Sequence, residues 1–410
     1  MKFSKLSQLF LVSSIGLVVA TLFSACAITT IDYIFVASSA GTGTSSAGQI
    51  ETYAVDAQSG ALRTGAPTVS SGGVNPVSMA VTSDYENLYA ANVGNRSIVH
   101  FTIGLHGELT SKDTITITGI PVAIAVNQAN TYLYVLSGPT PAVLAAYPLT
   151  SGTIGTAVSS PTLSLYGAYA AYSGDVMVPT GLNVLANNAA VYVTAYDQSA
   201  YNPGGTTTCT SNCANPGWVF GYTVGTSGAL TPLANPIEAG VKPTAIATDP
   251  TNRFAYVTDY ASNQLIGYTI MSSSTLDFML GGPYRTGDEP TAVVIDQRGK
   301  FVYVTNSLDS TVSPYQLNLA TGAPTVTVSA TSAAGANSTD TQPVAVTIDP
   351  AVGRFVYTAN YLGNSVSGFI LDPTSGSISQ TQATPYPTGF HPTAVIGVPH
   401  GNHSSQSVAP

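Results

Sequence analysis

One recurring phrase of about 28 residues constrains the fold of this chain more than any other feature. It opens on Pro and passes through a core resembling Y-V-T-N, most clearly in the copies that begin at Pro243, Pro290 and Pro343. Weaker copies begin at Pro76, Pro121 and Pro179, and a seventh begins at Pro392 and stops after PTAVIGV. Successive starts lie 45 to 64 residues apart. That period is typical of propeller blades and is too long for short solenoid repeats.

Each copy is expected to form one four-stranded antiparallel blade. In the copy at Pro290 the predicted strands are PTAVVID, FVYVTN, TVSPYQL and PTVTVSAT, with short turns between them. These runs are rich in Val, Thr, Tyr and Phe and are bounded by Gly, Asn, Asp or Pro, as strands should be. The run FVYVT lacks polar/apolar alternation, which indicates a strand covered on both faces, as in a blade between two neighbours.

The incomplete seventh copy predicts how the ring closes. The segment from Pro392 supplies only a first strand, whereas YIFVASS, QIETYAV and ALRTG near the N-terminus match the missing second, third and fourth strands. Sharing one blade between the two ends of the chain removes free sheet edges. The sequence therefore predicts an all-β, seven-bladed propeller.

The N-terminal segment predicts export. Lys2 and Lys5 precede an apolar run, Leu9 to Phe23, which is followed by small residues and Cys26. This pattern resembles a bacterial lipoprotein signal, in which Cys26 is acylated; a plain secretory signal or an uncleaved anchor remains the alternative. We expect a membrane-anchored protein in the periplasm or at the cell surface of a bacterium, touching the membrane through the lipid alone. The expected segments are a signal over 1–25, a linker over 26–32, the propeller over 33–399 and a disordered tail over 400–410.

Two cysteines remain after Cys26. Cys209 and Cys213 lie in an insertion, residues 198–217, which interrupts the copy at Pro179. Outside the cytoplasm a local disulfide is the expected state. A metal site is the alternative, although no His or carboxylate lies close to them in the sequence.

Charge limits the partners. The chain has 20 acidic and 11 basic residues, a net charge of −9, and no basic cluster. This argues against nucleic acid and against charge-driven binding to anionic lipid. We expect a monomer with no cofactor and no metal, whose partner is a protein, a glycan or a small molecule.

Two sets of loops should meet on one face of the ring and form the natural place for a polar ligand. One set enters the first strands, and the other joins the second and third strands. The candidate ligand-binding residues in these loops are Asn92, Arg96, Lys242, Asp259, Asp288, Asn306, Asp309, Asn360 and His391. The repeated Asn and Asp at strand ends are also explained by turn chemistry alone, because their side chains bond the turn backbone.

Catalytic signatures are sparse: the chain has no G-x-S-x-G, H-E-x-x-H, EF-hand or P-loop motif. The residues that do not repeat are the weak catalytic candidates: His391, Asp288, Glu289, Arg96 and Lys242. Solvated loop charge is the alternative for each. His100 and His106 are expected near a turn of the copy at Pro76.

The cycle of Pro start, Y-V-T-N core and S-G-x-L turn resembles the seven-bladed lactonase family, which includes propeller-type 6-phosphogluconolactonases and bacterial surface proteins with Y-V-T-N repeats. The resemblance covers nearly all of residues 30–399. It implies that an enzymatic member would carry His just after a blade-start Pro, and often Glu after the strand-end Asn.

This chain departs from that pattern. Thr or Val follows every blade-start Pro, Ser307 and Tyr361 follow Asn306 and Asn360, and His391 precedes its Pro. The sequence therefore favours a non-catalytic binding scaffold that acts through its loop face. A lactone hydrolase acting on a lactone outside the cytoplasm, with His391 or the Asp288–Glu289 pair as base and Arg96 or Lys242 polarising the carbonyl, is the alternative.

Overall fold

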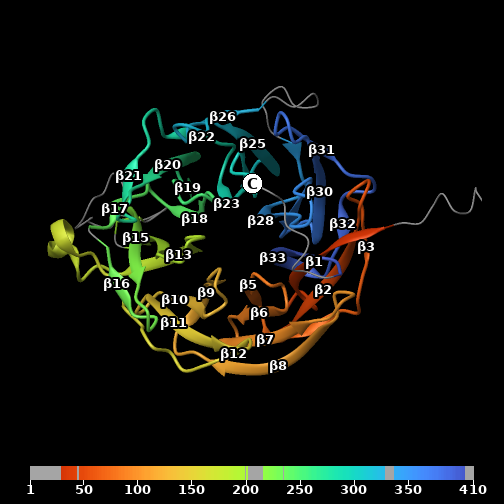
Figure 1. Ribbon diagram of the computed structural model, residues 1–410, viewed down its shortest axis with the longest axis horizontal. Helices are drawn as coiled ribbons and strands as arrows, with labels where there is room; N and C mark the ends of the chain where they lie inside the picture. Colours follow the sequence, from red (N-terminus) through yellow and green to blue (C-terminus); the bar gives the residue numbers. More distant parts are fainter. Residues whose placement is uncertain are drawn as a thin grey trace, which may run out of the picture.

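The computed structural model describes residues 29–43, 46–198, 200–201, 216–233, 235–327 and 337–401. It shows seven antiparallel sheets arranged in a ring around a central axis (Figure 1). Apart from one short 3-10 helix, η2 (Gly167–Tyr172), every regular element is a strand. The predicted seven-bladed propeller is confirmed. None of the described helices is both long and apolar enough to cross a membrane.

The blades are numbered from the copy at Pro76, and the strands of each run from the axis outward. Blade one has β5 (Pro76–Val81), β6 (Asn87–Asn92), β7 (Ser97–Ile103) and β8 (Leu109–Thr116). Blade two has β9 (Ile120–Val126), β10 (Tyr132–Gly138), β11 (Val143–Thr150) and β12 (Thr153–Ile154). Blade three has β13 (Met177–Val184), β14 (Ala190–Asp197), β15 (Gly217–Val224), β16 (Leu230–Pro232) and β17 (Ile237–Glu238).

The next three blades follow the same plan. Blade four has β18 (Pro243–Thr248), β19 (Phe254–Asp259), β20 (Gln264–Ile270), β21 (Leu276–Phe278) and β22 (Tyr284–Arg285). Blade five has β23 (Pro290–Ile295), β24 (Phe301–Asn306), β25 (Thr311–Leu317), β26 (Pro324–Val326) and β27 (Asn337–Ser338). Blade six has β28 (Pro343–Ile348), β29 (Phe355–Asn360), β30 (Ser365–Leu371), β31 (Ile378–Gln380) and β32 (Tyr386–Pro387).

Blade seven is shared by the two ends of the chain, as predicted. Its inner strand is β33 (Phe390–Pro399), and β1 (Thr30–Ser39), β2 (Ala47–Asp56), β3 (Leu62–Thr64) and β4 (Val69–Val74) complete it. The pairing of β1 with β33 runs from Asp32 opposite Pro399 to Ser39 opposite Phe390. His400 continues the order beyond β33, because its N–H donates to the carbonyl of Ile31 at 2.9 Å.

The second strand of each blade forms the densest part of the core. All six residues of β24 are buried, and β6, β19 and β29 are equally enclosed. This confirms that the FVYVTN run is covered on both faces. Neighbouring blades share apolar clusters across each seam, such as the one that joins Phe301 and Tyr303 of blade five to Val356 and Phe369 of blade six.

In most blades a tyrosine of the second strand hydrogen-bonds a backbone carbonyl of the next blade. The hydroxyl of Tyr303 donates to the carbonyl of Gly376 in the following blade at 2.9 Å. The equivalent bonds run from Tyr89 to Gly152, Tyr192 to Ser274, Tyr256 to Gly322 and Tyr357 to Gly60. Tyr134 of blade two is the exception, because its buried hydroxyl has no partner within the described residues. Blade seven carries Phe35 at the corresponding position.

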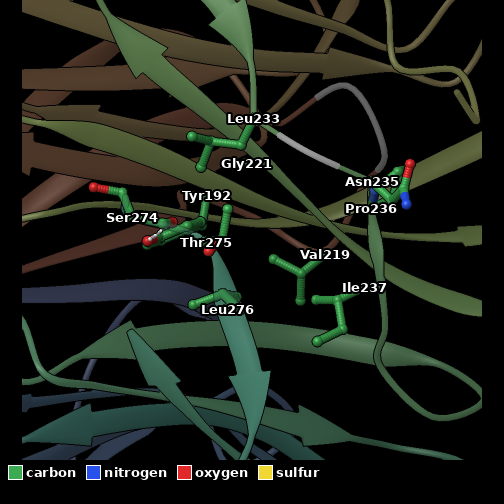
Figure 2. A pocket seen from close by; sticks show the side chains of 10 residues that line it. All are labelled: Tyr192, Val219, Gly221, Leu233, Asn235, Pro236, Ile237, Ser274, Thr275 and Leu276. Atoms are coloured by element: carbon green, nitrogen blue, oxygen red, sulfur yellow. Dashed lines mark hydrogen bonds between the residues drawn. The ribbon is translucent and has the colours of Figure 1, made fainter. Parts of the chain in front are cut away.

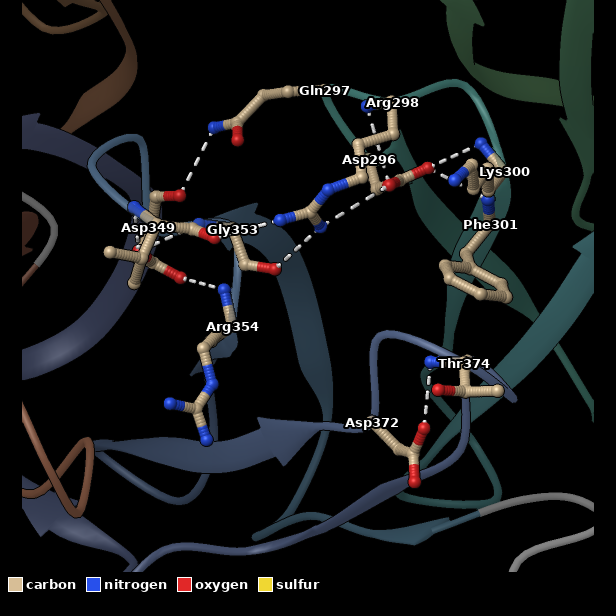
Figure 3. Close-up of polar contacts among 12 residues, drawn as sticks. Asp296, Gln297, Arg298, Lys300, Phe301, Asp349, Gly353, Arg354, Asp372 and Thr374 are labelled. Carbon is tan, nitrogen blue, oxygen red and sulfur yellow. Dashed lines mark hydrogen bonds and ion pairs between the residues drawn. The ribbon is translucent and has the colours of Figure 1, made fainter. Parts of the chain in front are cut away.

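The loops before the first strands and after the second strands lie on one face of the ring, here called the upper face, and the opposite face is the lower face. On the lower face, a carboxylate holds the turn between the first and second strands of blades four to six. Asp296 accepts the N–H groups of Lys300 and Phe301 at 2.6 and 2.8 Å (Figure 3). Asp249 and Asp349 accept the corresponding N–H groups of their own turns. The Arg298 guanidinium reaches across to the carbonyl of Val352 at 3.1 Å, and so ties blade five to blade six.

Several predictions concern residues beyond the described part of the chain. The signal over 1–25, the acylation site Cys26, the disulfide between Cys209 and Cys213, and the tail from 402 onward all lie outside the described residues.

Candidate functional site on the upper face

The residues that precede the blade-start prolines, here called the pre-proline ring, end the loops on the upper face. They are Asn75, Ile120, Val178, Lys242, Glu289, Gln342 and His391. Four of the seven adopt positive φ: Asn75 at 53°, Glu289 at 56°, Gln342 at 60° and His391 at 50°. Side chains with a Cβ rarely adopt this conformation, and a following Pro restricts the backbone further. The surrounding loops must therefore hold these residues in place.

Lys242 and Glu289 meet around one tyrosine. The Lys242 Nζ atom lies 4.3 Å from the centre of the Tyr260 ring and 5.5 Å from that of Tyr201. The Glu289 carboxylate lies near the hydroxyl of Tyr260 and acts on it electrostatically. Burial, reinforced by Glu289, raises the pKa of Tyr260 to about 12. Burial lowers the pKa of Lys242, and the nearby Glu289 carboxylate opposes that shift. An ammonium, a carboxylate and two aromatic rings thus share one half-buried place.

Backbone bonds fix this group. Asp259 accepts the N–H groups of Val241 and Lys242 at 2.9 and 2.8 Å. The Asn263 side-chain oxygen accepts the N–H of Glu289 at 2.9 Å.

The neighbouring Asp288 is already engaged at two points. Its carboxylate accepts from the Asn263 amide at 2.8 Å, and its N–H donates to Asp309 at 2.7 Å. A hollow of about 350 Å³ lies beside Asn263, and its lining includes Tyr284 and Arg285.

His391 forms a second, similar group between blades six and seven. Its ring stacks on Tyr361 with the centres 4.5 Å apart and the planes 11° from parallel. Its N–H donates to the Asn364 side chain at 2.8 Å. The Glu51 carboxylate, whose pKa burial raises, accepts the N–H of Gly389 and steadies the same loop. Tyr260 and Tyr361 occupy equivalent positions, and each contacts the pre-proline residue of the next blade.

The repeated strand-end residues lie beneath the face and not on it. Asn92, Asp259, Asn306 and Asn360 are fully buried. Asn306, for example, accepts the N–H of Gly287 at 3.1 Å and donates to Thr311 and Ser313. Their side chains support the loops and do not reach solvent in this structure.

Arg96 stands apart from the other candidates. It lies in blade one at a φ of 50°, is exposed, and donates to the carbonyl of Thr118 at 3.1 Å. Within the described residues it has no bond to Lys242, Glu289, Asp288 or His391. The structure therefore brings Lys242 and Glu289 together, keeps Asp288 and Asp309 beside them, and leaves Arg96 separate.

The threonines after the prolines have a structural role in the inner ring. Thr244 donates to the carbonyl of Pro290 at 2.8 Å, and Thr291 donates to that of Pro343 at 2.8 Å. Thr393 closes the series by donating to Pro76 at 2.6 Å. The position at which an enzymatic relative is expected to carry His is here used to join adjacent blades.

Sequence reasoning missed Tyr260 and Glu51 as site residues. The signal for Tyr260 was present, because it follows the strand-end Asp259 just as Tyr361 follows Asn360. His100, expected near a turn, lies instead within β7 and is 2% exposed. Among the described residues, no three His, Cys, Asp or Glu side chains gather as a metal site would require.

Other hollows lie away from these candidates. An apolar pocket of about 230 Å³ sits at the outer seam of blades three and four, where Leu233, Ile237 and Leu276 line it beside Tyr192 (Figure 2). A larger hollow of about 1020 Å³ opens on the lower face of blades one and two.

Comparison with known proteins now places the chain. Residues 245–394, from blade four to the inner strand of blade seven, match the family model described as lactonase, 7-bladed beta-propeller. The family resemblance is confirmed. Those residues form the C-terminal part of the ring, and the chain as a whole has the seven-bladed propeller fold. Comparison with curated protein sequences gives no significant match.

Solved structures share the seven-bladed fold of this chain at low sequence identity. The periplasmic gluconolactonase of Pseudomonas aeruginosa superposes with a TM-score of 0.71 and 16% identity, over 90% of this chain and 99% of that one. A putative 6-phosphogluconolactonase of Bacteroides uniformis gives 0.70 and 15%, over 90% and 100%. A hypothetical selenium-binding protein of Sulfolobus tokodaii gives 0.66 and 12%, over 93% and 97%. Such identities establish the fold alone.

Proposed function

We propose that this propeller is an exported, lipid-anchored binding protein that holds a polar ligand, such as a glycan, on its upper face. The observation that carries the proposal is the pair of tyrosines, Tyr260 and Tyr361, each set against a charged or titratable pre-proline residue. Aromatic faces offer large, rigid contact area, and adjacent polar groups supply orientation. The strained backbone at Glu289 and His391 supports the same view, because such strain concentrates at functional sites.

Binding to the upper face can be measured by calorimetry with a panel of neutral and acidic oligosaccharides. We expect Tyr260→Leu, which removes the aromatic face, to weaken binding about tenfold or more, because a stacked aromatic contact contributes on the order of 1 kcal/mol beyond its buried area. Tyr260→Phe keeps the ring and loses only the hydroxyl near Glu289, so its effect should be smaller. Asp372→Asn, on the lower face, is the matched control. Unchanged affinity in Tyr260→Leu, with a folded protein, would contradict this site.

The export and anchor rest on the sequence around Cys26. In a bacterial host, Cys26→Ser should move the protein from the membrane fraction to the soluble extracytoplasmic fraction, because a serine cannot carry the thioether-linked lipid. Membrane retention in this variant would point to an uncleaved N-terminal anchor instead.

Lactone hydrolysis is a second candidate function, favoured by the family match and by the approach of both Lys242 and Glu289 to Tyr260. In this reaction Glu289 takes a proton from water, whose oxygen attacks the lactone carbonyl while Lys242 stabilises the developing oxyanion. Collapse of the tetrahedral intermediate breaks the ring C–O bond. The proton held by Glu289 passes to the departing alkoxide, and a hydroxy acid results.

Acid release from gluconolactone and from aliphatic lactones, corrected for spontaneous opening, separates the two functions. Turnover that is lost in Glu289→Gln and kept in Asp288→Asn would support the hydrolase with Glu289 as base. Loss in His391→Ala alone would move the base to blade seven. A flat response across the panel from a folded protein would leave ligand binding as the function of this face.

A further inference from the structure

The described chain enters the propeller on the lower face. Successive strands of a blade are antiparallel, so the turns between the first and second strands and between the third and fourth strands both lie on that face. β1 is the second strand of blade seven and begins at Thr30. The carbonyl of Thr29 accepts the N–H of Ala57, which lies in the turn between β2 and β3, at 2.9 Å. The chain therefore joins the ring at its lower face.

Little chain lies between this entry point and the residue expected to carry lipid. Thr29 follows Cys26 by three residues, which span about 10 Å when fully extended. β1 is second from the axis, with β2 and β3 outside it, so the outer edge of the blade is two strand spacings, or about 10 Å, away. A lipid on Cys26 therefore holds the lower face toward the membrane, because the tether is too short to pass around the edge.

Four basic side chains gather on the same face, and we call them the basic patch. They are Arg253, Arg298, Lys300 and Arg354, which all lie in the turns between the first and second strands of blades four to six. Nine Lys and Arg residues remain after Lys2 and Lys5 of the expected signal, so the patch holds nearly half of them. The sequence shows no cluster because one repeat separates these turns, and the ring brings them together.

The cations of the patch reach solvent, whereas the carboxylates of the same turns do not. Arg253, Lys300 and Arg354 are exposed. The turn carboxylates described above are at most 2% exposed and already accept backbone N–H groups. Asp372, an exposed carboxylate on blade six, accepts two backbone N–H groups of its own turn at 2.8 and 3.0 Å (Figure 3). An anionic headgroup that approaches these three blades therefore meets mainly cations.

The other half of the lower face is acidic and carries the tether. Asp56 of blade seven and Asp84, Glu86 and Glu108 of blade one lie in or beside its turns. Anionic lipid repels these carboxylates, and the short tether at blade seven opposes that repulsion. Blade four of the basic patch lies across the ring from blade seven (Figure 1). The tether and the patch thus act at two separated places, and a face held at both lies flat on a surface.

We propose that this propeller lies with its lower face against an anionic bilayer surface, held by the lipid of Cys26 at blade seven and by the basic patch at blades four to six. A lipid and a basic patch are two signals, a combination that holds a protein stably on a membrane. The upper-face site then points away from the membrane. This inference rests on the lipid anchor proposed above, and it adds a protein contact to the expectation that the lipid alone touches the membrane.

Three lysines report the orientation, because each lies on a different side of the ring. Lys300 belongs to the basic patch, Lys112 is exposed on the outer strand β8 of blade one, and Lys242 is on the upper face. The protein, expressed from the full-length chain and purified from the membrane fraction, is placed on vesicles of phosphatidylcholine and phosphatidylglycerol. An amine-reactive ester that does not cross membranes then labels the lysines, and mass spectrometry of peptides measures each rate on vesicles and in detergent.

We expect the labelling rate of Lys300 to fall about tenfold on vesicles, because a docked state favoured tenfold leaves it open about one-tenth of the time. The rates of Lys112 and Lys242 should not change. These two lysines are therefore the internal controls for the general effect of the vesicles on the reagent.

Matched double variants test the basic patch. Arg253→Gln with Arg354→Gln removes two of its charges and keeps Lys300 as the probe. Arg96→Gln with Arg285→Gln removes two exposed charges that lie away from the lower face. We expect the first pair to raise the labelling rate of Lys300 on vesicles severalfold and the second pair to leave it unchanged, because only charges near the surface attract anionic lipid.

Protection of Lys112 in place of Lys300 would show that the propeller stands on its edge. Equal rates on vesicles and in detergent for all three lysines would show that the ring lies free of the surface. Either result overturns the orientation, and full protection of Lys300 in the Arg253→Gln, Arg354→Gln protein overturns the role of the patch. The same digests report the anchor separately. A lipid-modified Cys26 peptide with unprotected Lys300 refutes the orientation alone, whereas a Cys26 peptide without lipid refutes the proposed anchor and the orientation with it.

Discussion

The lower-face turns of blades four to six and the pre-proline ring of the upper face belong to the same repeat. The turns keep one side chain constant, whereas the ring keeps only the backbone position. In the turns, Asp249, Asp296 and Asp349 each accept two or more backbone N–H groups in the same pattern. In the ring, the backbone position repeats while the side chain changes from Lys to Glu, Gln and His. We interpret the side chain that repeats, the Asp of each turn, as support for the fold. We interpret the pre-proline position, where the side chain varies on a repeated backbone, as the place where this propeller can select its ligand.

The largest expected effect tests the supporting side of this comparison. Asp296 is fully buried and serves Lys300 and Phe301, so Asp296→Ala leaves backbone N–H groups without partners. We expect the free energy of unfolding to fall by about 3 kcal/mol. Denaturant unfolding measures this change. Asp277→Ala, an exposed carboxylate, should cost no more than about 0.5 kcal/mol, and equal losses in the two variants would contradict the distinction.

A second test uses the turn of blade six, where a second carboxylate, that of Asp32, lies beside the turn carboxylate of Asp349. Asp32 lies against Asp349, both fully buried, and burial together with Asp349 raises the pKa of Asp32 to about 9. Burial also raises the pKa of Asp349, although four backbone N–H groups oppose that shift, so the pair holds its proton mainly on Asp32.

The sign of the pH dependence follows from this raised pKa. Below about pH 4 the Asp32 carboxyl is protonated in both the folded and the unfolded protein, so burial of this residue costs nothing extra. As pH rises from about 4 to about 9, the unfolded protein releases this proton and the folded protein keeps it, so the free energy of unfolding falls. Asp32→Asn imitates the protonated side chain. We expect it to raise the free energy of unfolding by about 2 kcal/mol at pH 8 and to flatten its pH dependence. A wild-type protein that becomes more stable between pH 5 and 8 through this pair would contradict the assignment.

The tyrosines that bond the next blade offer a matched pair of variants, and we expect a smaller change in the free energy of unfolding from them. Tyr303→Phe removes a buried bond to Gly376, so we expect a loss of about 1 kcal/mol. Tyr134→Phe removes a hydroxyl that has no partner among the described residues, so the expected change is about zero or slightly stabilising. Thermal or denaturant unfolding of the two variants side by side decides the matter, and equal destabilisation would show that Tyr134 has a partner after all.

The smallest effect on stability is expected on the upper face. Glu289 adopts a φ of 56°, a conformation that glycine accepts freely, so Glu289→Gly should change the free energy of unfolding by less than about 1 kcal/mol. The same substitution should remove ligand binding or lactone turnover. A large loss of stability would show instead that Glu289 is part of the support, as Asp296 is.

Much of the fold was predictable because it repeats. The Pro starts, the buried second strands and the shared blade seven follow from seven imperfect copies of one phrase, and each copy reinforces the same assignment. The general location of the candidate site followed too, because the loops before the first strands and after the second strands must end on the same face.

The individual site residues were less predictable. Asn92 and Asn360 look like surface amides in the sequence, but they are fully buried because the loops fold over them. Tyr260 looks like an ordinary loop residue, yet it joins Lys242 of its own blade to Glu289 of the next. These contacts cross a blade boundary, and no local pattern specifies what the neighbouring blade will present.

The amino-acid sequence by itself determined the number of blades, their strand order and the way the ring closes, because strand periodicity and turn residues are local and are repeated many times. Only the tertiary structure decided which polar residues are reachable, which carboxylates meet, and that His100 lies buried beneath a cavity between Asn87 and Asp113. Burial and charge proximity depend on residues far apart in the chain, so they appear only when neighbouring blades pack against one another.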